Sequence, residues 1–356
     1  MPTKPSRARR WLRKGKAKVV YNDLGIFVVQ LVSEPSGTDT QPISVGVDPG
    51  SRYTGIGVQS TKTTLWMAHL QLPFETVKGR MEQRRMIRRG RRGRRINRQV
   101  PYDQRAHRQK RFDNRRYKKV PPSIRANRQL ELRVINELLK IYPLTTATWE
   151  MVVARGDKGF SPVMVGQRWA VDQLKKLLPV VTKEGWQTSN LRQWLGLEKQ
   201  KTSKGDAIPA THAVDGVALA SSLFVRYRQL KGKQGWWEGS VDITPALFAV
   251  IRRPPICRRQ LHLMVPSIGG IRRKYGGTTT RHGFRKGDYV KTEMAGRVVY
   301  GWVSGDTERQ VSVSDINWKR LGQFSAKKTC LVKRSTGLLV LPSKGLSNLT
   351  PSRGQI

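Results

Sequence analysis

The spacing of hydrophobic residues changes several times along the chain, and each change predicts a different element. Apolar and polar residues alternate over residues 24–32, which predicts a strand, and a polar stretch over residues 33–42 reads as a linker. Three short apolar runs follow, at residues 43–48, 54–60 and 63–72. Strands in such close succession predict an antiparallel meander.

The middle of the chain has a helical period. Residues 130–142 and 168–178 each carry the apolar stripe of an amphipathic helix, and a short strand is predicted between them at residues 144–150. A further helix is predicted over residues 208–224, where Pro209 suits a helix start and small residues allow close packing. Strands followed by alternating helices and a strand indicate the α/β class. Beyond residue 244, short β-rich pieces separated by turns predict a small, barrel-like β domain.

The net charge of the chain indicates what kind of partner it binds. The chain has 356 residues, with 68 Lys and Arg against 24 Asp and Glu, and a formal net charge of +44. Three segments, residues 1–20, 80–128 and 246–356, carry +8, +17 and +16 of it. So much positive charge repels itself and calls for a polyanion, and nucleic acid is the expected one.

The most basic segment has a helical arrangement of arginines. Residues 81–99 favour a helix but have almost no apolar face, so packing against a core is not expected to hold it. Arginine suits bidentate contact with phosphate. The arginines recur on two adjacent helical stripes, and the RNA-binding candidates are Arg84, Arg85, Arg88, Arg89, Arg91, Arg92 and Arg95.

Other features bear on the cellular setting. Cys257 and Cys330 are the only cysteines, and neither belongs to a Cys-x-x-Cys pair, so neither a disulfide framework nor a zinc site of that kind is expected. No apolar run approaches the roughly 18 residues of a membrane span, and the basic N-terminus lacks the apolar segment of a signal peptide. These patterns indicate a soluble, cytoplasmic protein.

Three acids stand where a fold would bring them together. Asp48 ends the first strand of the meander, Glu150 ends a later strand, and Asp215 follows His212 at a spacing that puts both on one helix face. Two divalent metal ions roughly 4 Å apart need several carboxylates from rigid elements, and these three acids supply them. His212 would orient the attacking water or take its proton. Each residue alone has a simpler structural explanation, but the joint arrangement favours phosphodiester hydrolysis.

These residues lie in segments that resemble the three motifs of RuvC nucleases. ISVGVDPGSRYTGIGV (43–58) is similar to motif I, TWE (148–150) to motif II and THAVDGVALA (211–220) to motif III. An arginine-rich helix after motif I resembles the transposon-encoded, RNA-guided ancestors of type II CRISPR effectors. The opening PTKPSRARRWLRKGKAKV (2–19) is similar to their PLMP domain, although the PLMP tetrad itself is absent. RRKYGG and HGFRKGDYV resemble their C-terminal segment.

One absence points to a branch of that family. Relatives of the IscB type insert an HNH nuclease, which needs a histidine as general base, between motifs II and III. Only 61 residues separate Glu150 from His212, and none of them is a histidine. The chain therefore resembles IsrB, the branch of the IscB family that has a RuvC nuclease alone.

The resemblance implies an α/β fold with an RNase H-like RuvC core, split by an arginine-rich bridge helix and joined to a PLMP-like N-terminal domain and a basic β-rich C-terminal domain. The expected boundaries are 1–42 for the PLMP-like domain and linker, 43–77 for RuvC part I, 78–128 for the bridge helix and RNA-binding segment, 129–245 for RuvC parts II and III, and 246–356 for the C-terminal region.

The resemblance also implies a function. A guide (omega) RNA would pair with one strand of double-stranded target DNA, and the RuvC site would nick the displaced strand with two Mg²⁺ ions, or Mn²⁺ in their place. The protein would act as a monomer in a prokaryotic cytoplasmic ribonucleoprotein. It would also read a short motif flanking the target, for which the candidates are Arg272, Arg273, Lys274, Arg285, Lys286, Gln310 and Asn317.

Two other functions remain open from the sequence. A RuvC-type Holliday-junction resolvase would share the acidic site, but it is normally a compact dimer and has no need of the arginine helix. A non-catalytic RNA-binding module would tolerate the loss of an acid, whereas all three acids are present.

Overall fold

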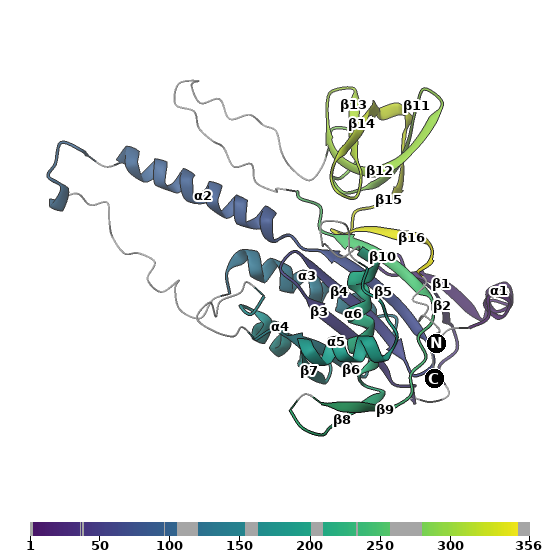
Figure 1. Cartoon of the computed structure of the whole chain (residues 1–356). Helices are drawn as coiled ribbons and strands as arrows, with labels where there is room; N and C mark the ends of the chain where they lie inside the picture. The colour runs from purple at the N-terminus through teal and green to yellow at the C-terminus, as the bar shows by residue number, and fades with distance from the viewer. Residues whose placement is uncertain are drawn as a thin grey trace. The chain divides into compact units, whose positions relative to one another are not determined.

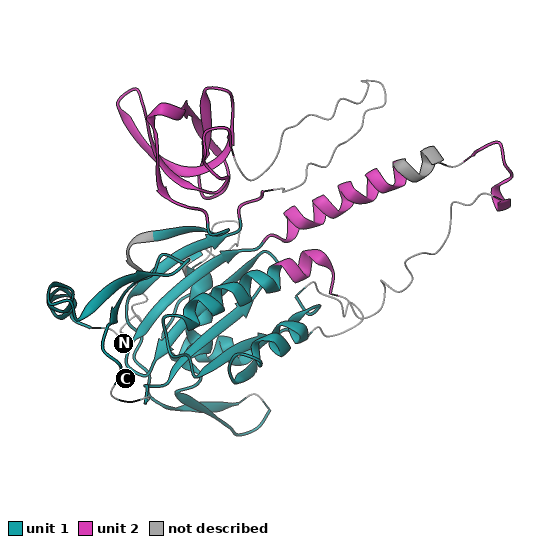
Figure 2. Cartoon of the chain, turned by 180° about the vertical axis from the view of Figure 1, so that it is seen from behind, with its two compact units in different colours: residues 1–72, 127–253, 336–356 teal, residues 73–126, 254–335 magenta. Residues whose placement is uncertain are grey.

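The structure is a computed structural model, and it shows a mixed α/β protein with a central mixed sheet (Figure 1). The chain forms two compact units, coloured separately in Figure 2: residues 1–72, 127–253 and 336–356 form the first, and residues 73–126 and 254–335 form the second. Within the described residues, no helix is long and apolar enough to cross a membrane. The structure describes residues 3–35, 37, 39–95, 97–104, 120–153, 163–200, 209–232, 234–256 and 280–347.

The first unit is built on a seven-stranded sheet with the order β16-β10-β5-β4-β3-β6-β7. The strands β3, β4 and β5 pair antiparallel, which confirms the predicted meander, while β6 runs parallel to β3 and β7 parallel to β6. The order β5-β4-β3-β6-β7 fits an RNase H-like core. The strands are β3 (Ile43–Pro49), β4 (Tyr53–Ser60), β5 (Thr64–Gln71), β6 (Thr146–Met151), β7 (Val180–Glu184), β10 (Ala246–Arg252) and β16 (Leu339–Ser347).

The far edge of this sheet differs from the sequence expectation. The sequence places residues 246–356 in one β-rich region, but β10 pairs parallel with β5, and β16 pairs antiparallel with β10. Ile251 and Leu339 are fully buried at this edge. The pairing joins segments far apart in the chain, so no local pattern reveals it.

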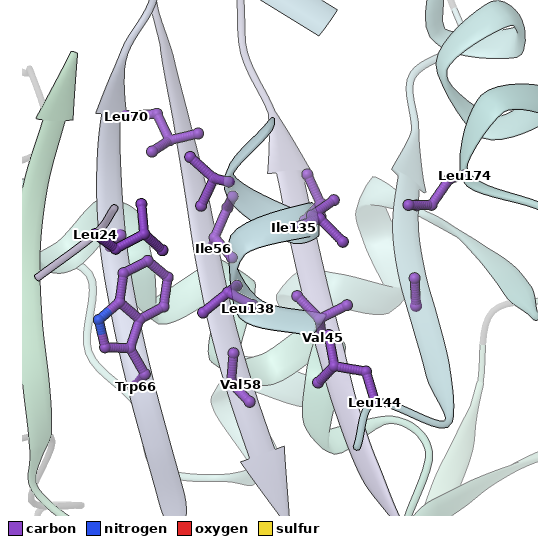
Figure 3. Close-up of a cluster of buried hydrophobic side chains, with 14 of the residues drawn as sticks. Leu24, Val45, Ile56, Val58, Trp66, Leu70, Ile135, Leu138, Leu144 and Leu174 are labelled. Atoms are coloured by element: carbon purple, nitrogen blue, oxygen red, sulfur yellow. The ribbon is translucent and has the colours of Figure 1, made fainter. Parts of the chain in front are cut away.

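One face of the sheet is covered by apolar side chains from α3 (Pro122–Leu139) and α4 (Gln167–Leu174). Figure 3 shows Ile135 and Leu138 of α3 among Val45, Ile56 and Val58 of the sheet. These are the two predicted amphipathic helices, with α3 starting earlier than expected, at Pro122. Proline is favoured in the first turn, where its missing N–H costs no hydrogen bond.

The helix α6 (Pro209–Ser221) lies directly on the backbone of β3 and β4 at the opposite face. Gly46 and Gly57 are partners across these two strands. A Cβ atom at Gly46 would stand 2.1 Å from the carbonyl oxygen of Gly216, and one at Gly57 would stand 2.4 Å from the backbone nitrogen of Val217. No side chain fits in that space, so the glycines fix the height of α6 above the sheet.

This close packing predicts a loss of stability in Gly46→Ala. The added methyl group must push α6 away, and overpacking of this kind lowers the free energy of unfolding by about 1–3 kcal/mol. Gly79→Ala in α2 (Phe74–Arg95) is the matched control, since nothing lies within 4 Å of a Cβ there. That change should stabilise its helix by roughly 0.5–1 kcal/mol. Thermal unfolding measures both, and equal melting temperatures for Gly46→Ala and the wild type would contradict the packing.

The remaining elements of the first unit are short. The N-terminal helix α1 (Pro5–Arg13) precedes an antiparallel hairpin of β1 (Ala17–Tyr21) and β2 (Phe27–Leu31), where the sequence predicts a single strand over residues 24–32. The helix α5 (Gly185–Trp194) follows β7, and neither was predicted. A second hairpin joins β8 (Val225–Gln229) and β9 (Gly235–Gly239).

The second unit contains α2 and a five-stranded antiparallel sheet with the order β14-β13-β12-β11-β15. Its core is formed by Val290, Val303, Val311, Val313 and Phe324. The short β-rich segments beyond residue 280 therefore form a sheet with its own hydrophobic core. The elements are β11 (Tyr289–Met294), β12 (Arg297–Asp306), β13 (Gln310–Ser314), β14 (Arg320–Ser325) and β15 (Thr329–Lys333), with short 3₁₀ turns η1 (Tyr102–Gln104) and η5 (Ala326–Lys328).

Candidate active site

Two of the predicted acids lie on neighbouring parallel strands. Asp48 is near the end of β3 and Glu150 is near the end of β6, and their preceding residues, Val47 and Trp149, are register partners. Val47 and Trp149 are fully buried in the core on the α3 side. Because side chains alternate along a strand, Asp48 and Glu150 point to the other face, toward α6.

The turn after Asp48 is held by a buried polar network. Arg128 of α3 donates a hydrogen bond to the carbonyl oxygen of Gly50 (3.2 Å) and forms an ion pair with Glu131 (2.8 Å). The hydroxyl of Thr54 donates to Glu131 (2.6 Å). The side chains of Arg128 and Glu131 are almost fully buried. These buried contacts restrain the turn and with it the strand end that carries Asp48.

The start of α6 brings His212 and Asp215 over the same strand end. Asp48 is the register partner of Gly55 on β4. A Cβ atom at Gly55 would stand 1.9 Å from the carbonyl oxygen of His212, so α6 touches the sheet beside Asp48. Asp215 lies within the next turn of α6 and is only 3% exposed.

The three carboxyl groups share one electrostatic environment. Burial raises the pKa of Asp48 well above its usual value, and Glu150 and Asp215 raise it further. Burial also raises the pKa of Glu150, and Asp215 adds to that increase. Like charges raise the pKa of a carboxyl group only at short range, so these further increases at Asp48 and Glu150 come from neighbouring carboxyl groups.

Two cations hold Asp215. One of its carboxylate oxygens accepts a hydrogen bond from Arg192 Nη1 at 2.6 Å, and the other forms an ion pair with Lys199 Nζ. Arg192 belongs to α5, and Lys199 follows that helix. Both cations also lower the pKa values of Asp48 and Glu150, against the larger effect of burial.

The donor chemistry of this site suits a divalent cation, but its side-chain geometry does not form a metal shell. Carboxylate oxygens are the ligands that Mg²⁺ prefers. Within the described residues, however, no group of three or more His, Cys, Asp and Glu side chains is arranged to hold a metal ion. Both oxygens of Asp215 instead contact cations, one Arg192 and the other Lys199.

His212 belongs to a small aromatic cluster. Its ring centroid lies 5.2 Å from that of His69 on β5 and 5.5 Å from that of Tyr53 on β4, and Tyr53 and His69 are 4.8 Å apart. His69 is 2% exposed, and burial, assisted by His212, lowers its pKa to about 4. His69 is therefore neutral at pH 7 and contributes a ring rather than a charge.

A pocket of about 730 Å³ adjoins the cations that hold Asp215. It is lined by the end of α5 and the segment that follows, including Arg192, Leu197 and Lys199. Sequence reasoning missed Arg192 and Lys199, as well as Tyr53 and His69. A single arginine or lysine near a helix end and a lone histidine in a strand carry no pattern that distinguishes them from ordinary surface or core residues.

The other predicted residues all fall within the ranges of the second unit. Arg84, Arg85, Arg88 and Arg89 are exposed on α2, while the side chains of Arg91, Arg92 and Arg95 are outside the described part of the structure. Arg272, Arg273 and Lys274 also lie outside the described residues. In the second unit, Arg285, Gln310 and Asn317 are exposed, and Lys286 is half-buried.

Stability without metal should depend on pH through Asp48. Its pKa is raised in the folded protein, so the folded state retains a proton that the unfolded chain loses near pH 4, and stability falls as the pH rises toward the raised value. Asp48→Asn removes that loss. Its melting temperature in EDTA should exceed that of the wild type at pH 8, and the difference should shrink toward pH 4.

The exposed Asp172 of α4 provides the control for this measurement. Asp172→Asn should follow the wild type across the same pH range in thermal unfolding. A constant difference between Asp48→Asn and the wild type from pH 4 to pH 8 would contradict the raised pKa.

Comparison with known proteins gives two similarities. The family described as RRXRR protein matches residues 1–158, a range that includes Asp48, Glu150 and α2 but ends before α6. Read literally, the pattern in that name occurs at residues 88–92 and 91–95. Among solved structures, the chain is similar to T. thermophilus RuvC in complex with Holliday junction substrate, with 15% identity and a TM-score of 0.26 over 51% of this chain and 90% of that chain. No curated protein matches the sequence.

Proposed function

We propose that the chain is a nuclease of the RuvC type and that Asp48, Glu150, His212 and Asp215 form its active site. One observation carries this proposal: two carboxyl groups on β3 and β6 have raised pKa values and lie beside the buried Asp215 of α6, at a glycine-lined contact between helix and sheet. Grouping buried like charges costs stability, and folds accept that cost mainly at functional sites. The motifs around these residues, which resemble RuvC motifs, support the same reaction class.

The residues divide the chemistry between them. Asp48, Glu150 and Asp215 would hold divalent ions, Mg²⁺ or Mn²⁺, which when bound neutralise phosphodiester charge and activate water. The Nδ1 atom of His212 is buried, so Nε2 is the atom that would accept the proton of the attacking water. The neutral ring of His69 packs against His212 and would keep its orientation.

We further propose that RNA guides the cleavage. The exposed arginines of α2 form a basic surface much larger than a single nuclease cleft needs, and the RRXRR match covers that helix. The segment between Glu150 and His212 has no histidine that could serve a second, HNH-type nuclease. One active site cuts one strand, so the expected product is a nick in the displaced DNA strand. A resolvase would use the same acids but has no need of the arginines on α2.

The reading of a flanking DNA motif is proposed for the second unit. Arg285 and Gln310 are exposed there, and their side chains are of the kinds that read guanine and adenine in the major groove. Most basic residues of such surfaces contact phosphate rather than bases. Only a loss of preference at one position of the motif would identify a base-reading residue.

The test of guided cleavage is the RNA that accompanies the protein. The chain is expressed together with the genomic region that flanks its gene, purified at moderate salt, and the bound RNA is sequenced. A single long structured RNA supports a guided nuclease. A mixture without a dominant species would favour the resolvase.

A further inference from the structure

The function proposed above leaves two charged groups of the site without a role. Arg192 and Lys199 contact Asp215 with side chains that are only 17% and 26% exposed. Arg192 is also fixed on its own helix, because its second terminal nitrogen donates to the Ser189 hydroxyl at 3.3 Å. These contacts are part of the folded site and not a pairing of mobile surface charges.

The two cations and a metal ion compete for the same atoms. One oxygen of Asp215 accepts a hydrogen bond at 2.6 Å and the other forms an ion pair, so a metal ion that binds this carboxylate competes with both cations. A divalent ion at Asp215 would also lie within a few ångströms of two positive charges and be repelled by them.

A pocket beside Arg192 and Lys199 offers these side chains another binding partner. Arg192 and Lys199, which contact Asp215, also line the pocket of about 730 Å³. An arginine paired with a lysine beside a nuclease site is suited to a phosphate group, because the guanidinium binds it in bidentate fashion and the ammonium adds a point charge. Glu198 also lines the pocket, and its negative charge would disfavour a second phosphate there.

We propose that Arg192 and Lys199 change partners during the reaction: they neutralise Asp215 in the metal-free protein, and they bind a phosphate of the strand to be cut once Asp215 is released to a divalent ion. This inference rests on the proposed nuclease function and adds to it a phosphodiester-binding pair. The same two residues would also weaken metal binding when no substrate is present.

The experiment measures Mn²⁺ binding and nicking in Lys199→Gln. The RNA-free full-length chain is titrated with Mn²⁺, and free Mn²⁺ is followed by electron paramagnetic resonance. Loss of one competing positive charge should tighten Mn²⁺ binding roughly tenfold. Nicking by the guided complex at saturating Mn²⁺ should instead slow by roughly tenfold or more, because the phosphate loses a charged contact.

Two control variants accompany it. Lys176→Gln changes an exposed lysine after α4 and should leave both quantities at the wild-type values. Lys199→Arg keeps the positive charge and should restore wild-type Mn²⁺ affinity. Circular dichroism and thermal unfolding establish that each variant is folded before it is titrated.

Opposite changes in the two quantities support the exchange, because a merely structural ion pair would weaken metal binding and nicking together. Parallel losses, or unchanged Mn²⁺ affinity in Lys199→Gln, would overturn it. Either result leaves the nuclease function standing if Asp48→Asn still abolishes nicking. If Asp48→Asn nicks like the wild type, the nuclease function itself falls, and the exchange falls with it.

Discussion

Asp48→Asn is expected to slow DNA nicking by at least about a thousand-fold while guide RNA binding stays at the wild-type level. The substitution keeps the size of the side chain and removes its charge. The rate should fall because charge neutralisation at the phosphodiester accounts for most of the acceleration in such sites. Folding should survive, because a buried carboxyl with a raised pKa is replaced by a neutral amide.

The measurement is single-turnover nicking of supercoiled plasmid by the guided complex. Glu150→Gln and Asp215→Asn should show the same loss, since the three carboxyl groups act as one site. Asp172→Asn, on an exposed part of α4, should nick at the wild-type rate. If Asp48→Asn retains a tenth of the activity, the carboxyl cluster is not the catalytic centre.

The second large effect concerns RNA affinity. Replacing Arg84, Arg85, Arg88 and Arg89 with glutamine should weaken guide RNA binding by two or more orders of magnitude near physiological salt, because each phosphate contact releases a counterion. Each lost phosphate contact lowers the steepness of log affinity against log salt by roughly 0.7–0.9, so the loss of four contacts should lower it by about three. Filter binding across a salt series measures both quantities.

Two controls separate this effect from general charge loss. The same four positions changed to lysine should keep most of the salt slope, because the charge remains while the bidentate geometry is lost. Glutamine at Lys175 and Lys176, two exposed lysines after α4, should change the affinity little. An unchanged salt slope in the four-arginine variant would show that α2 does not lie on the RNA.

The sequence was most informative where a pattern is local. The structure confirms the meander β3-β4-β5 and the helices α3, α4 and α6, each predicted from a local pattern, although α3 begins eight residues before its predicted start. Asp48, Glu150 and Asp215 could be selected because each stands at the end of a strand or one helical turn from a histidine. The effect of Glu150 on the pKa of Asp48 follows from the topology, which places β6 beside β3.

The sequence was least informative where contacts are distant. β10 and β16 join the core sheet by pairing with segments more than eighty residues away, so they were assigned to the C-terminal region. β7 and α5 are short and have weak apolar periods. Arg192 and Lys199 are recognised as site residues only by their contacts with the buried Asp215, and no residue spacing in the sequence predicts such a contact.

Strand-resolved cleavage tests the central claim most directly. Linear duplex DNA carrying a different fluorophore on each strand is incubated with the guided complex and Mg²⁺, and the products are separated under denaturing conditions. The proposed function predicts cuts in the displaced strand alone, none in the strand paired with the guide, and none in either strand with Asp48→Asn. Cleavage of both strands by the wild type, or cleavage without the guide RNA, would contradict it.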